Sequence, residues 1–306
     1  MGMRRIVARG ILVLLLSGAV GVAGCGGRKD GGEAKPPAPT YTAEQAAAVR
    51  AQADSGDAGA QLKVGRMHAT GDGAPQDTTE AVLWYRKAAD QGLADAQFAL
   101  AEAYATGTGV EGDTPQAAGW YRKAAAKGHV EAMKRLGKIY EQNHDFAAAG
   151  AYFEKAAEKG DPHAQYHLGD MYDLGFEVDV SDLVDIGFGK KRTSFPQDKS
   201  RAAHWFRAAA EQGWCDKADQ LARYYLQGEG VKKDPIEGYK WALVAITAPN
   251  PDYYDEKLVD MTKGVHETLV ADAKNVLTAG QEAEGEKRAR EQMARVKCVV
   301  TTAGDL

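Results

Sequence analysis

The sequence lacks the charge excess and the basic segments of a nucleic-acid-binding protein. Its 306 residues contain 38 lysines and arginines against 43 aspartates and glutamates, a formal net charge of −5. A surface that binds nucleic acid needs clustered cations to neutralise phosphates, so nucleic acid is not an expected partner. The content of 44% hydrophobic and 26% charged residues also excludes collagen-like, disordered and multi-span membrane classes.

Common catalytic and metal-binding motifs are also missing. The chain contains no His-Glu-x-x-His, no Gly-x-Ser-x-Gly and no Gly-x-x-x-x-Gly-Lys sequence, the motifs that place a zinc ion, a nucleophilic serine or a bound nucleotide. His163 and His167 have the spacing of a ligand pair on one helix face, but no third ligand accompanies them. We therefore expect both histidines on a solvated helix face, and we predict no catalytic residue, metal or cofactor.

Residues 1–24 have the order of a secretory signal. Arginines within residues 4–9 precede an apolar stretch at 11–22, which is shorter than the roughly 20 residues of a membrane span. The sequence Val-Ala-Gly-Cys at residues 22–25 resembles the bacterial lipobox. This resemblance implies that Cys25 becomes the lipid-modified N-terminus. An ordinary secretory signal with an unrelated cysteine is the alternative.

The residues after Cys25 predict a membrane and a tether. Gly26 and Gly27 follow the lipid site. By resemblance to the lipoproteins of bacteria with two membranes, an aspartate after the cysteine implies retention at the inner membrane, and neither residue is an aspartate. The outer membrane is therefore favoured, with the protein facing the periplasm. The segment 25–40 is rich in glycine and proline and has no apolar periodicity, which predicts a disordered tether.

Cysteines are few, since the sequence contains 3 in all. After Cys25, the remaining two are Cys215 and Cys298. In an oxidising periplasm an even pair is a disulfide candidate, and the bond would join the last repeated unit to the C-terminal segment. Two buried thiols are the alternative, because connectivity cannot be proved from a sequence.

A short aromatic and alanine-rich phrase recurs along the chain. Its clearest copies are Trp84-Tyr85-Arg86-Lys87-Ala88-Ala89, Trp120-Tyr121-Arg122-Lys123-Ala124-Ala125, Tyr152-Phe153-Glu154-Lys155-Ala156-Ala157 and Trp205-Phe206-Arg207-Ala208-Ala209-Ala210. Its apolar residues recur at helical spacing and share one face. A glycine closes each copy, and a second phrase running from alanine through leucine to tyrosine follows it, as in Ala132 to Tyr140. The pattern predicts two helices per unit.

The whole unit resembles the Sel1-like repeat, a relative of the tetratricopeptide repeat. Its parts are Ala-x-x-x-Leu-Gly-x-x-Tyr, Gly-x-Gly-Val, Asp, Trp-Tyr-x-Lys-Ala-Ala and a closing Gly. The resemblance implies an all-α fold, a right-handed α-solenoid of helix-turn-helix Sel1-like repeats with helical caps. It covers five units in residues 56–250, with a capping helix at 41–55 and a helical cap at 251–306. Glycines such as Gly137 predict close helix contacts.

The fourth unit carries an insertion at about 176–196. Its aspartates step by three residues, whereas a calcium loop of the EF-hand type needs acids at alternate positions and a glycine, so metal binding is not predicted. The insertion is too apolar for a solvated loop. We expect a small hairpin or helix that packs on the solenoid, or a contact with a partner.

Resemblance to tetratricopeptide repeats implies that the first helix of each unit lines a concave groove. The residues that flank the Leu-Gly pair would then face a partner: Phe98, Glu102, Lys134, Lys138, Tyr166, Asp170, Asp219 and Arg223. Two aromatic side chains among mixed charges suit an extended polypeptide. The predicted partners are thus a protein of the cell envelope and, through the lipid on Cys25, the membrane.

The predicted function is a periplasm-facing, lipid-anchored scaffold that binds a protein and has no catalytic activity. One alternative is a peptidoglycan-related or β-lactamase-like enzyme. Against it, no serine after the signal segment has a lysine three residues later, and no Lys-Thr-Gly is present, as serine β-lactamases require. A second alternative is a periplasmic regulator that holds a membrane sensor.

Overall fold

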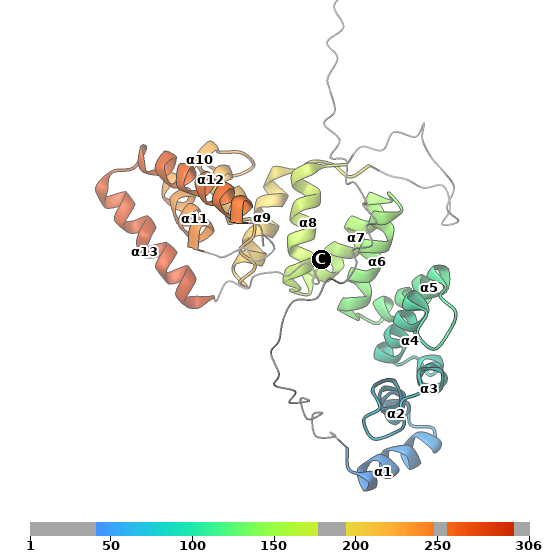
Figure 1. The fold of residues 1–306 in the computed structure, drawn as a ribbon. Helices are drawn as coiled ribbons and strands as arrows, with labels where there is room; N and C mark the ends of the chain where they lie inside the picture. The colour runs from blue at the N-terminus through green and yellow to red at the C-terminus, as the bar shows by residue number, and fades with distance from the viewer. Residues whose placement is uncertain (1–40, 177–193, 248–255, 297–306) are drawn as a thin grey trace, which may run out of the picture. The chain divides into compact units, whose positions relative to one another are not determined.

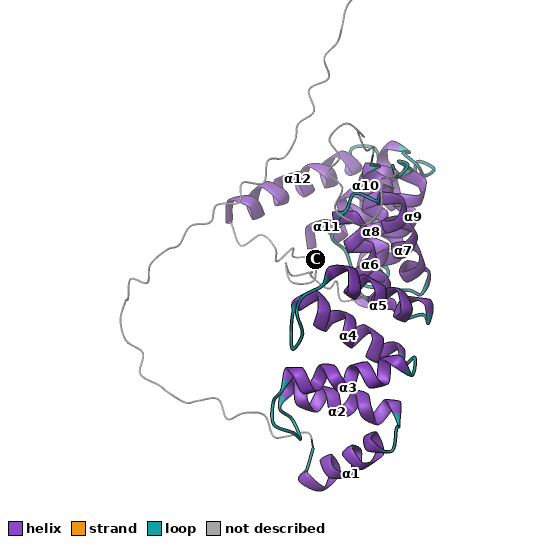
Figure 2. Ribbon diagram, turned by 90° about the vertical axis from the view of Figure 1, so that its right-hand side faces the viewer, coloured by secondary structure: helices purple, strands orange, loops and turns teal. Residues whose placement is uncertain are grey.

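The structure is a computed structural model that describes residues 41–176, 194–247 and 256–296 (Figure 1). The regular secondary structure of these residues consists of α-helices joined by loops (Figure 2). The β-contact within them is an isolated antiparallel bridge between Phe176 and Phe195. The all-α class predicted from the repeated phrases is confirmed.

Consecutive helices form pairs. The first helices of the pairs are α2 (Ala58–Thr70), α4 (Ala94–Thr106), α6 (Val130–Gln142), α8 (Pro162–Leu174) and α10 (Ala218–Gln227). The second helices are α3 (Thr78–Asp90), α5 (Thr114–Ala126), α7 (Phe146–Glu158), α9 (Lys199–Ala210) and α11 (Pro235–Thr247). One helix precedes the pairs and two follow them: α1 (Ala43–Asp54), α12 (Glu256–Lys274) and α13 (Ala279–Arg295).

The pairs stack through their neighbours, as expected of an α-solenoid. Each first helix packs most extensively on its own second helix, and most second helices pack on the next first helix. The exception is α9 with α10, which contact each other less than the other neighbouring units do. At the C-terminal end, α11 packs against both α12 and α13.

Aspartates define where many of the helices begin. The side chains of the N-cap aspartates accept hydrogen bonds from backbone N–H groups of the first turn, at Asp57, Asp77, Asp113, Asp145, Asp161 and Asp198. Such caps satisfy donors that have no partner inside the helix, each typically worth about 1 kcal/mol. The recurrent aspartate of the unit is therefore a helix start signal.

Within a unit, a glycine of the first helix lies against an aromatic ring of the second. A Cβ atom added to Gly137 would lie 2.7 Å from Phe153, and one added to Gly169 would lie 2.5 Å from Phe206. Gly65 meets Tyr85 in the same way, at 2.6 Å. We call these three contacts the helix-pair interface. They explain the recurrent glycines, because any side chain would collide with a ring.

The second glycine of each Gly-x-Gly turn joins one unit to the preceding one. Gly109 and Gly230 have positive φ angles of 72° and 68°. A Cβ atom on Gly109 would overlap the backbone of Thr78, and one on Gly230 would overlap the backbone of Lys199. Thr78 and Lys199 are the first residues of α3 and α9. Glycine is therefore required both by the left-handed backbone and by the close approach.

The helix α1 takes the place of a second helix before the first unit. Gly73 of the first unit's turn lies against Tyr41, which immediately precedes the N-cap of α1, Thr42. Gln61 of α2 donates a hydrogen bond of 3.2 Å to the carbonyl of Ala53 in α1. The bond of Gln61 repeats the bond that Gln97 of the next unit donates to Ala89 of α3, so α1 covers the end of the first pair.

Candidate functional site

The eight residues predicted to contact a partner lie on α4, α6, α8 and α10, and each is partly exposed. We call this set the first-helix face: Phe98, Glu102, Lys134, Lys138, Tyr166, Asp170, Asp219 and Arg223. The structure shows how far these side chains contact one another and their neighbours.

On α4, the two face residues are both held by the next unit. The ring of Phe98 stacks on His129 with centroids 4.5 Å apart. Glu102 accepts a hydrogen bond from the hydroxyl of Tyr121 and lies 3.1 Å from Nε of Arg135. Burial, together with this bond to Glu102, raises the pKa of Tyr121. The carboxylate of Glu102 thus connects α4, α5 and α6.

On α6, a lysine connects two units. The ammonium group of Lys134 lies 2.8 Å from Glu131 and 3.2 Å from Asp161. Burial opposes the charge, but these two carboxylates raise the pKa of Lys134 above its usual range. One turn further on, burial and the nearby Arg135 lower the pKa of Lys138. The two lysines of α6 on this face therefore have pKa values shifted in opposite directions.

On α8, an acidic residue faces a lysine from the following segment. The carboxylate of Asp170 lies 2.7 Å from the ammonium of Lys217. Burial raises the pKa of Asp170, and the charge of Lys217 opposes that shift. Tyr166 lies one turn earlier, with Lys217 5.5 Å from its ring. Asp219 and Arg223 instead pair with each other on α10, at 3.2 Å.

The histidines of α8 do not lie on a solvated helix face as predicted, because His163 is buried and His167 is only partly exposed. His163 is 7% exposed and contacts the edge of Trp214, with centroids 5.3 Å apart. His167 stacks on Phe153 at 5.2 Å. Burial, with help from the nearby His163 and Lys138, lowers the pKa of His167 to about 3. The two imidazole rings fill space between aromatic rings that come from α7 and from the loop before α10.

No metal site accompanies these histidines in the residues that the structure describes. Within those ranges, no group of three or more histidine, cysteine, aspartate or glutamate side chains is placed to hold an ion. Trp214 is specific to this unit, and its position after Gly213 is the signal that could have suggested a buried environment. Periodicity alone could not, because His163 and His167 have no counterpart in the other units.

Sequence reasoning missed a recurrent buried glutamine. Gln97 and Gln165 each donate a hydrogen bond of 3.2 Å to a carbonyl in the last turn of the preceding helix, at Ala89 and Ala157. The corresponding position of α10 is Asp219, and in the described chain Gln292 of α13 donates a hydrogen bond of 3.3 Å to the carbonyl of Ala210 instead. The recurring Ala-Gln pair in the sequence could have predicted this bond. Nothing in the sequence indicates that Gln292 of α13 makes the corresponding bond to Ala210.

Cys215 is buried, 3% exposed, and is disulfide-bonded. Cys298 lies outside the described residues, so its pairing with Cys215 stays a prediction. The described part of α13 supports it, because the sulfur of Cys215 lies 4.0 Å from the same Ala210 carbonyl that Gln292 contacts at 3.3 Å. Cys298 follows Gln292 by six residues, within reach of a short segment of chain.

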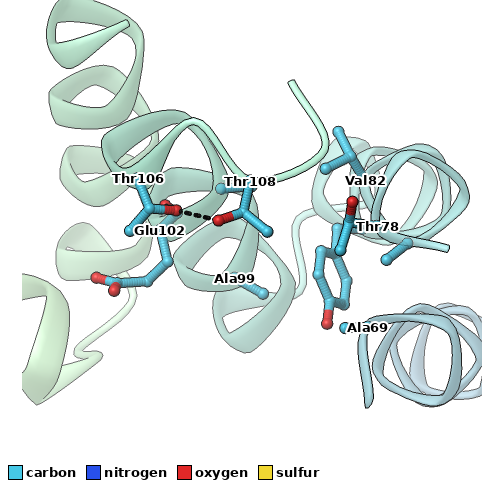
Figure 3. Close-up of a pocket in the computed structure, with 10 residues that line it drawn as sticks. Ala69, Thr78, Val82, Ala99, Glu102, Thr106 and Thr108 are labelled. Carbon is cyan, nitrogen blue, oxygen red and sulfur yellow. Dashed lines mark hydrogen bonds between the residues drawn. The ribbon is translucent and has the colours of Figure 1, made fainter. Parts of the chain in front are cut away.

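A cavity of about 280 Å³ lies beside Glu102, between the first and second units. Figure 3 shows Thr78 and Val82 of α3 on one side and Ala99 of α4 on the other. The carboxylate of Glu102 points away from Thr78 and Val82 in this view, which agrees with its contacts to Tyr121 and Arg135. The walls are largely apolar, with threonine hydroxyls between them, so the cavity suits an uncharged side chain.

Several predicted features lie wholly or partly outside the described residues. These are the signal 1–24, the lipid site Cys25, the tether 25–40 and most of the insertion. Both ends of the insertion are placed: the backbones of Phe176 and Phe195 exchange two hydrogen bonds of 2.8 Å. Phe176 also stacks on Phe146 at 4.2 Å. Among the described helices, none is sufficiently long and apolar to span a membrane.

Comparison with known proteins identifies the repeat. The family model of the Sel1 repeat matches residues 58–93, 94–129, 130–161, 162–183, 189–214 and 219–249. The fourth and fifth matches contain α8 and α9, which pack as one pair and lie on either side of the insertion in the sequence. A search of curated proteins found no significant match.

Two solved structures are similar over most of the chain. The first is c5321, a protective antigen present in uropathogenic Escherichia coli strains, with 28% identity and a TM-score of 0.56 over 83% of this chain. The match covers 49% of the c5321 chain, so the present chain spans about half of it. The second is a Sel1 repeat protein from Oxalobacter formigenes, with 23% identity, a TM-score of 0.52, and coverage of 76% and 90% of the two chains.

The family matches cover more than half of the sequence, and each of the first three matches contains one helix pair. Sel1 repeat proteins are protein-interaction scaffolds that bind protein partners, and their solenoid is typically not an enzyme. On these grounds the chain belongs to the Sel1 repeat family.

Proposed function

We propose that this protein is a lipid-anchored scaffold that faces the periplasm from the outer membrane and binds an envelope protein on its first-helix face. The observation that carries the binding site is the chemistry of that face. Its charged and aromatic residues differ from unit to unit and remain partly exposed, whereas the residues of the helix-pair interface recur. Residues that change between otherwise equal units are free to recognise a specific partner.

The contacts of the face indicate the kind of partner. Glu102 with Arg135 and Asp170 with Lys217 are ion pairs that remain partly exposed. A polypeptide with charges of both signs can compete for such groups, and the charges then set its register. The cavity between Thr78 and Ala99 would receive an uncharged side chain, and an anchored apolar group supplies most of the affinity in such interfaces.

The binding site is tested by crosslinking and quantitative pull-down from the cell envelope. The informative variant is K138E/Y166A, because neither residue caps a helix, whereas Lys134 contacts the N-cap Asp161. The matched control is K123E, a charge reversal on the exposed surface of α5. We expect one enriched partner, retained by K123E and lost from K138E/Y166A, with similar thermal unfolding for all three proteins. Equal retention by both variants contradicts the proposed face.

The cavity is tested by filling it. Ala99 is partly exposed and lines the cavity, so an A99F variant places a phenyl ring in the space next to Glu102. The substitution does not change the net charge. We expect A99F to weaken partner capture while circular dichroism and thermal unfolding stay near the wild type. Unchanged capture would show that the partner does not use this cavity.

The anchor is tested separately from binding. With Cys25 replaced by serine, we expect loss of incorporated palmitate and release of the protein from the membrane fraction, because the lipid supplies the attachment. Density fractionation of the wild type then separates outer from inner membrane. Palmitate incorporation that persists in C25S would contradict lipidation at Cys25, without bearing on the first-helix face.

A further inference from the structure

A second cavity, of about 550 Å³, lies at the Gly-x-Gly turn of the last unit. Its lining carries three cationic side chains, Arg207 from α9 and Lys232 and Lys233 from the turn. One carboxylate, Asp234, also belongs to the lining. Volumes of roughly 300–1,000 Å³ are typical of sites for small molecules, so the cavity is large enough for a ligand and has an excess of positive charge.

The carboxylates around this cavity are engaged elsewhere. Asp234 accepts hydrogen bonds of 3.1 Å from the backbone of Ile236 and of Glu237 at the start of α11. Glu229 of the same turn pairs with Lys199. Glu237 lies 2.7 Å from Lys240. The nearby negative charges therefore have partners of their own.

The cations of the cavity are engaged much less. No ion pair joins Arg207, Lys232 or Lys233 to another described residue. The guanidinium of Arg207 lies over the ring of Tyr225, 5.3 Å from its centroid. Its buried Nε has no hydrogen-bond partner in the described chain. A buried donor without an acceptor is costly, and an anion in the cavity would supply the acceptor.

The second unit provides a comparison within the same chain. Its turn reads Gly107-Thr-Gly-Val-Glu-Gly-Asp113, where the last unit reads Gly228-Glu-Gly-Val-Lys-Lys-Asp234. The backbones correspond, since Asp113 and Asp234 each donate an N–H bond of 2.9 Å to the tyrosine carbonyl of their first helix. Arg86, the counterpart of Arg207, donates to the hydroxyl of Tyr104. At the turn of the second unit, Arg86 thus has a hydrogen-bond partner, and the turn carries Glu111 and Gly112 instead of two lysines.

From these contacts we propose that the cationic cavity, lined by Arg207, Tyr225, Lys232, Lys233 and Asp234, binds a phosphate monoester. The three cationic side chains and the carboxylate of Asp234 leave an excess of two positive charges in the lining. This excess matches a phosphate monoester, which carries about −1.5 to −2 at neutral pH. A carboxylate would neutralise half of that excess. The guanidinium offers planar donors suited to phosphate oxygens. This inference is independent of the proposed scaffold function.

The proposal is tested by calorimetry at low ionic strength, with inorganic phosphate, glucose 6-phosphate, glucose and acetate as probes. The key variant, K232E/K233G, copies the residues of the second unit into the last one. Its control, K63E/K127Q, removes the same amount of positive charge from exposed positions on α2 and at the end of α5. Both variants should unfold at nearly the wild-type temperature, because the lysines are exposed and the copied residues already occupy an equivalent turn.

We expect phosphate and glucose 6-phosphate to bind, and glucose and acetate to bind at least about tenfold more weakly, because charge dominates recognition of phosphate. K232E/K233G should weaken both phosphate probes by about tenfold or more, while K63E/K127Q keeps them. Absence of phosphate binding to the wild type, equal binding of acetate, or equal losses in both variants would each overturn the proposal.

A second arm distinguishes the carrier of the phosphate. Phosphatidylcholine vesicles with and without phosphatidic acid present the same monoester on a lipid. If glucose 6-phosphate binds and the vesicles do not, the ligand is soluble; if vesicle binding requires phosphatidic acid and falls in K232E/K233G, a lipid headgroup carries it. Vesicle binding that is unchanged in K232E/K233G, combined with no binding of the soluble probes, excludes the cavity as a phosphate site.

Discussion

The helix-pair interface and the first-helix face share the helices α6 and α8 but follow different rules. In the interface, Gly137 meets Phe153 and Gly169 meets Phe206 at similar distances, 2.7 and 2.5 Å from an added Cβ atom. On the face, Phe98 stacks on a histidine, whereas Asp170 pairs with a lysine. Repetition therefore marks what holds the units together, and variation marks what each unit can offer to a ligand.

The sharpest way to break this comparison is to remove the same side chain from both regions. Phe153 is fully buried in the interface, and Phe98 is partly exposed on the face. We expect F153A to lower the free energy of unfolding by about 4 kcal/mol, because truncation of a buried phenylalanine leaves a cavity. F98A should cost less than half as much, with denaturant unfolding as the measurement. Similar losses in the two variants would remove the distinction.

The C-terminal helices sharpen the comparison. Gln292 of α13 donates a hydrogen bond to the carbonyl of Ala210, whereas in the second unit Gln97 of the unit's own first helix donates the equivalent bond to Ala89. If Cys298 is the disulfide partner of Cys215, C298S should lower the free energy of unfolding by about 3 kcal/mol, since the bond restricts a long loop in the unfolded chain. Peptide mapping under non-reducing conditions identifies the pair. Free thiol at Cys298 in the folded wild type would refute it.

Glycine substitutions test whether the interface depends on close approach. G169A should cost about 2 kcal/mol, because its Cβ would overlap Phe206 and overpacking is destabilising. Gly119 of α5 has open space around its Cα, so G119A should instead stabilise by up to about 1 kcal/mol through helix propensity. Thermal unfolding of the two variants gives the sign of each effect. A stabilising G169A would mean that Phe206 moves aside freely.

The smallest expected effect is the pH dependence that His167 gives to the stability of the protein. The folded-state pKa of His167 is lowered to about 3, so below about 6.5 the unfolded chain takes up a proton that the folded chain does not. The contribution of His167 to stability is full at pH 7.5 and falls by about 1.4 kcal/mol at pH 5.5. Comparing H167F with the wild type at both pH values measures it. An identical pH dependence in H167F would contradict the assignment.

The repeated part of the molecule was predictable from the sequence because each of its features occurs several times. The aspartate caps, the glycine and aromatic contacts and the helix pairs all follow from recurring positions. The unique features were not predictable in this way. His163 is covered by Trp214, which is specific to one unit, and Gln292 reaches Ala210 from 82 residues away. Such contacts depend on tertiary packing that no local pattern encodes.

The candidate site was predictable in position but not in its pairing. All eight expected residues are on first helices and partly exposed, as their place beside the Leu-Gly pair implies. Their partners come largely from residues outside the set, such as Arg135 and Lys217. The cationic cavity was missed because its signal is a comparison between turns, Lys232-Lys233 against Glu111-Gly112, rather than a motif.

The contact of Gly109 and Gly230 with the backbone of the preceding unit has a consequence for evolution. At both joints the nearest atoms belong to the main chain of Thr78 or Lys199, which every residue possesses. A duplicated or transplanted unit thus meets a compatible neighbour whatever side chains that neighbour carries. Arrays of this kind can change length by whole units without compensating mutations at the joints, while the residues of the first-helix face diverge independently.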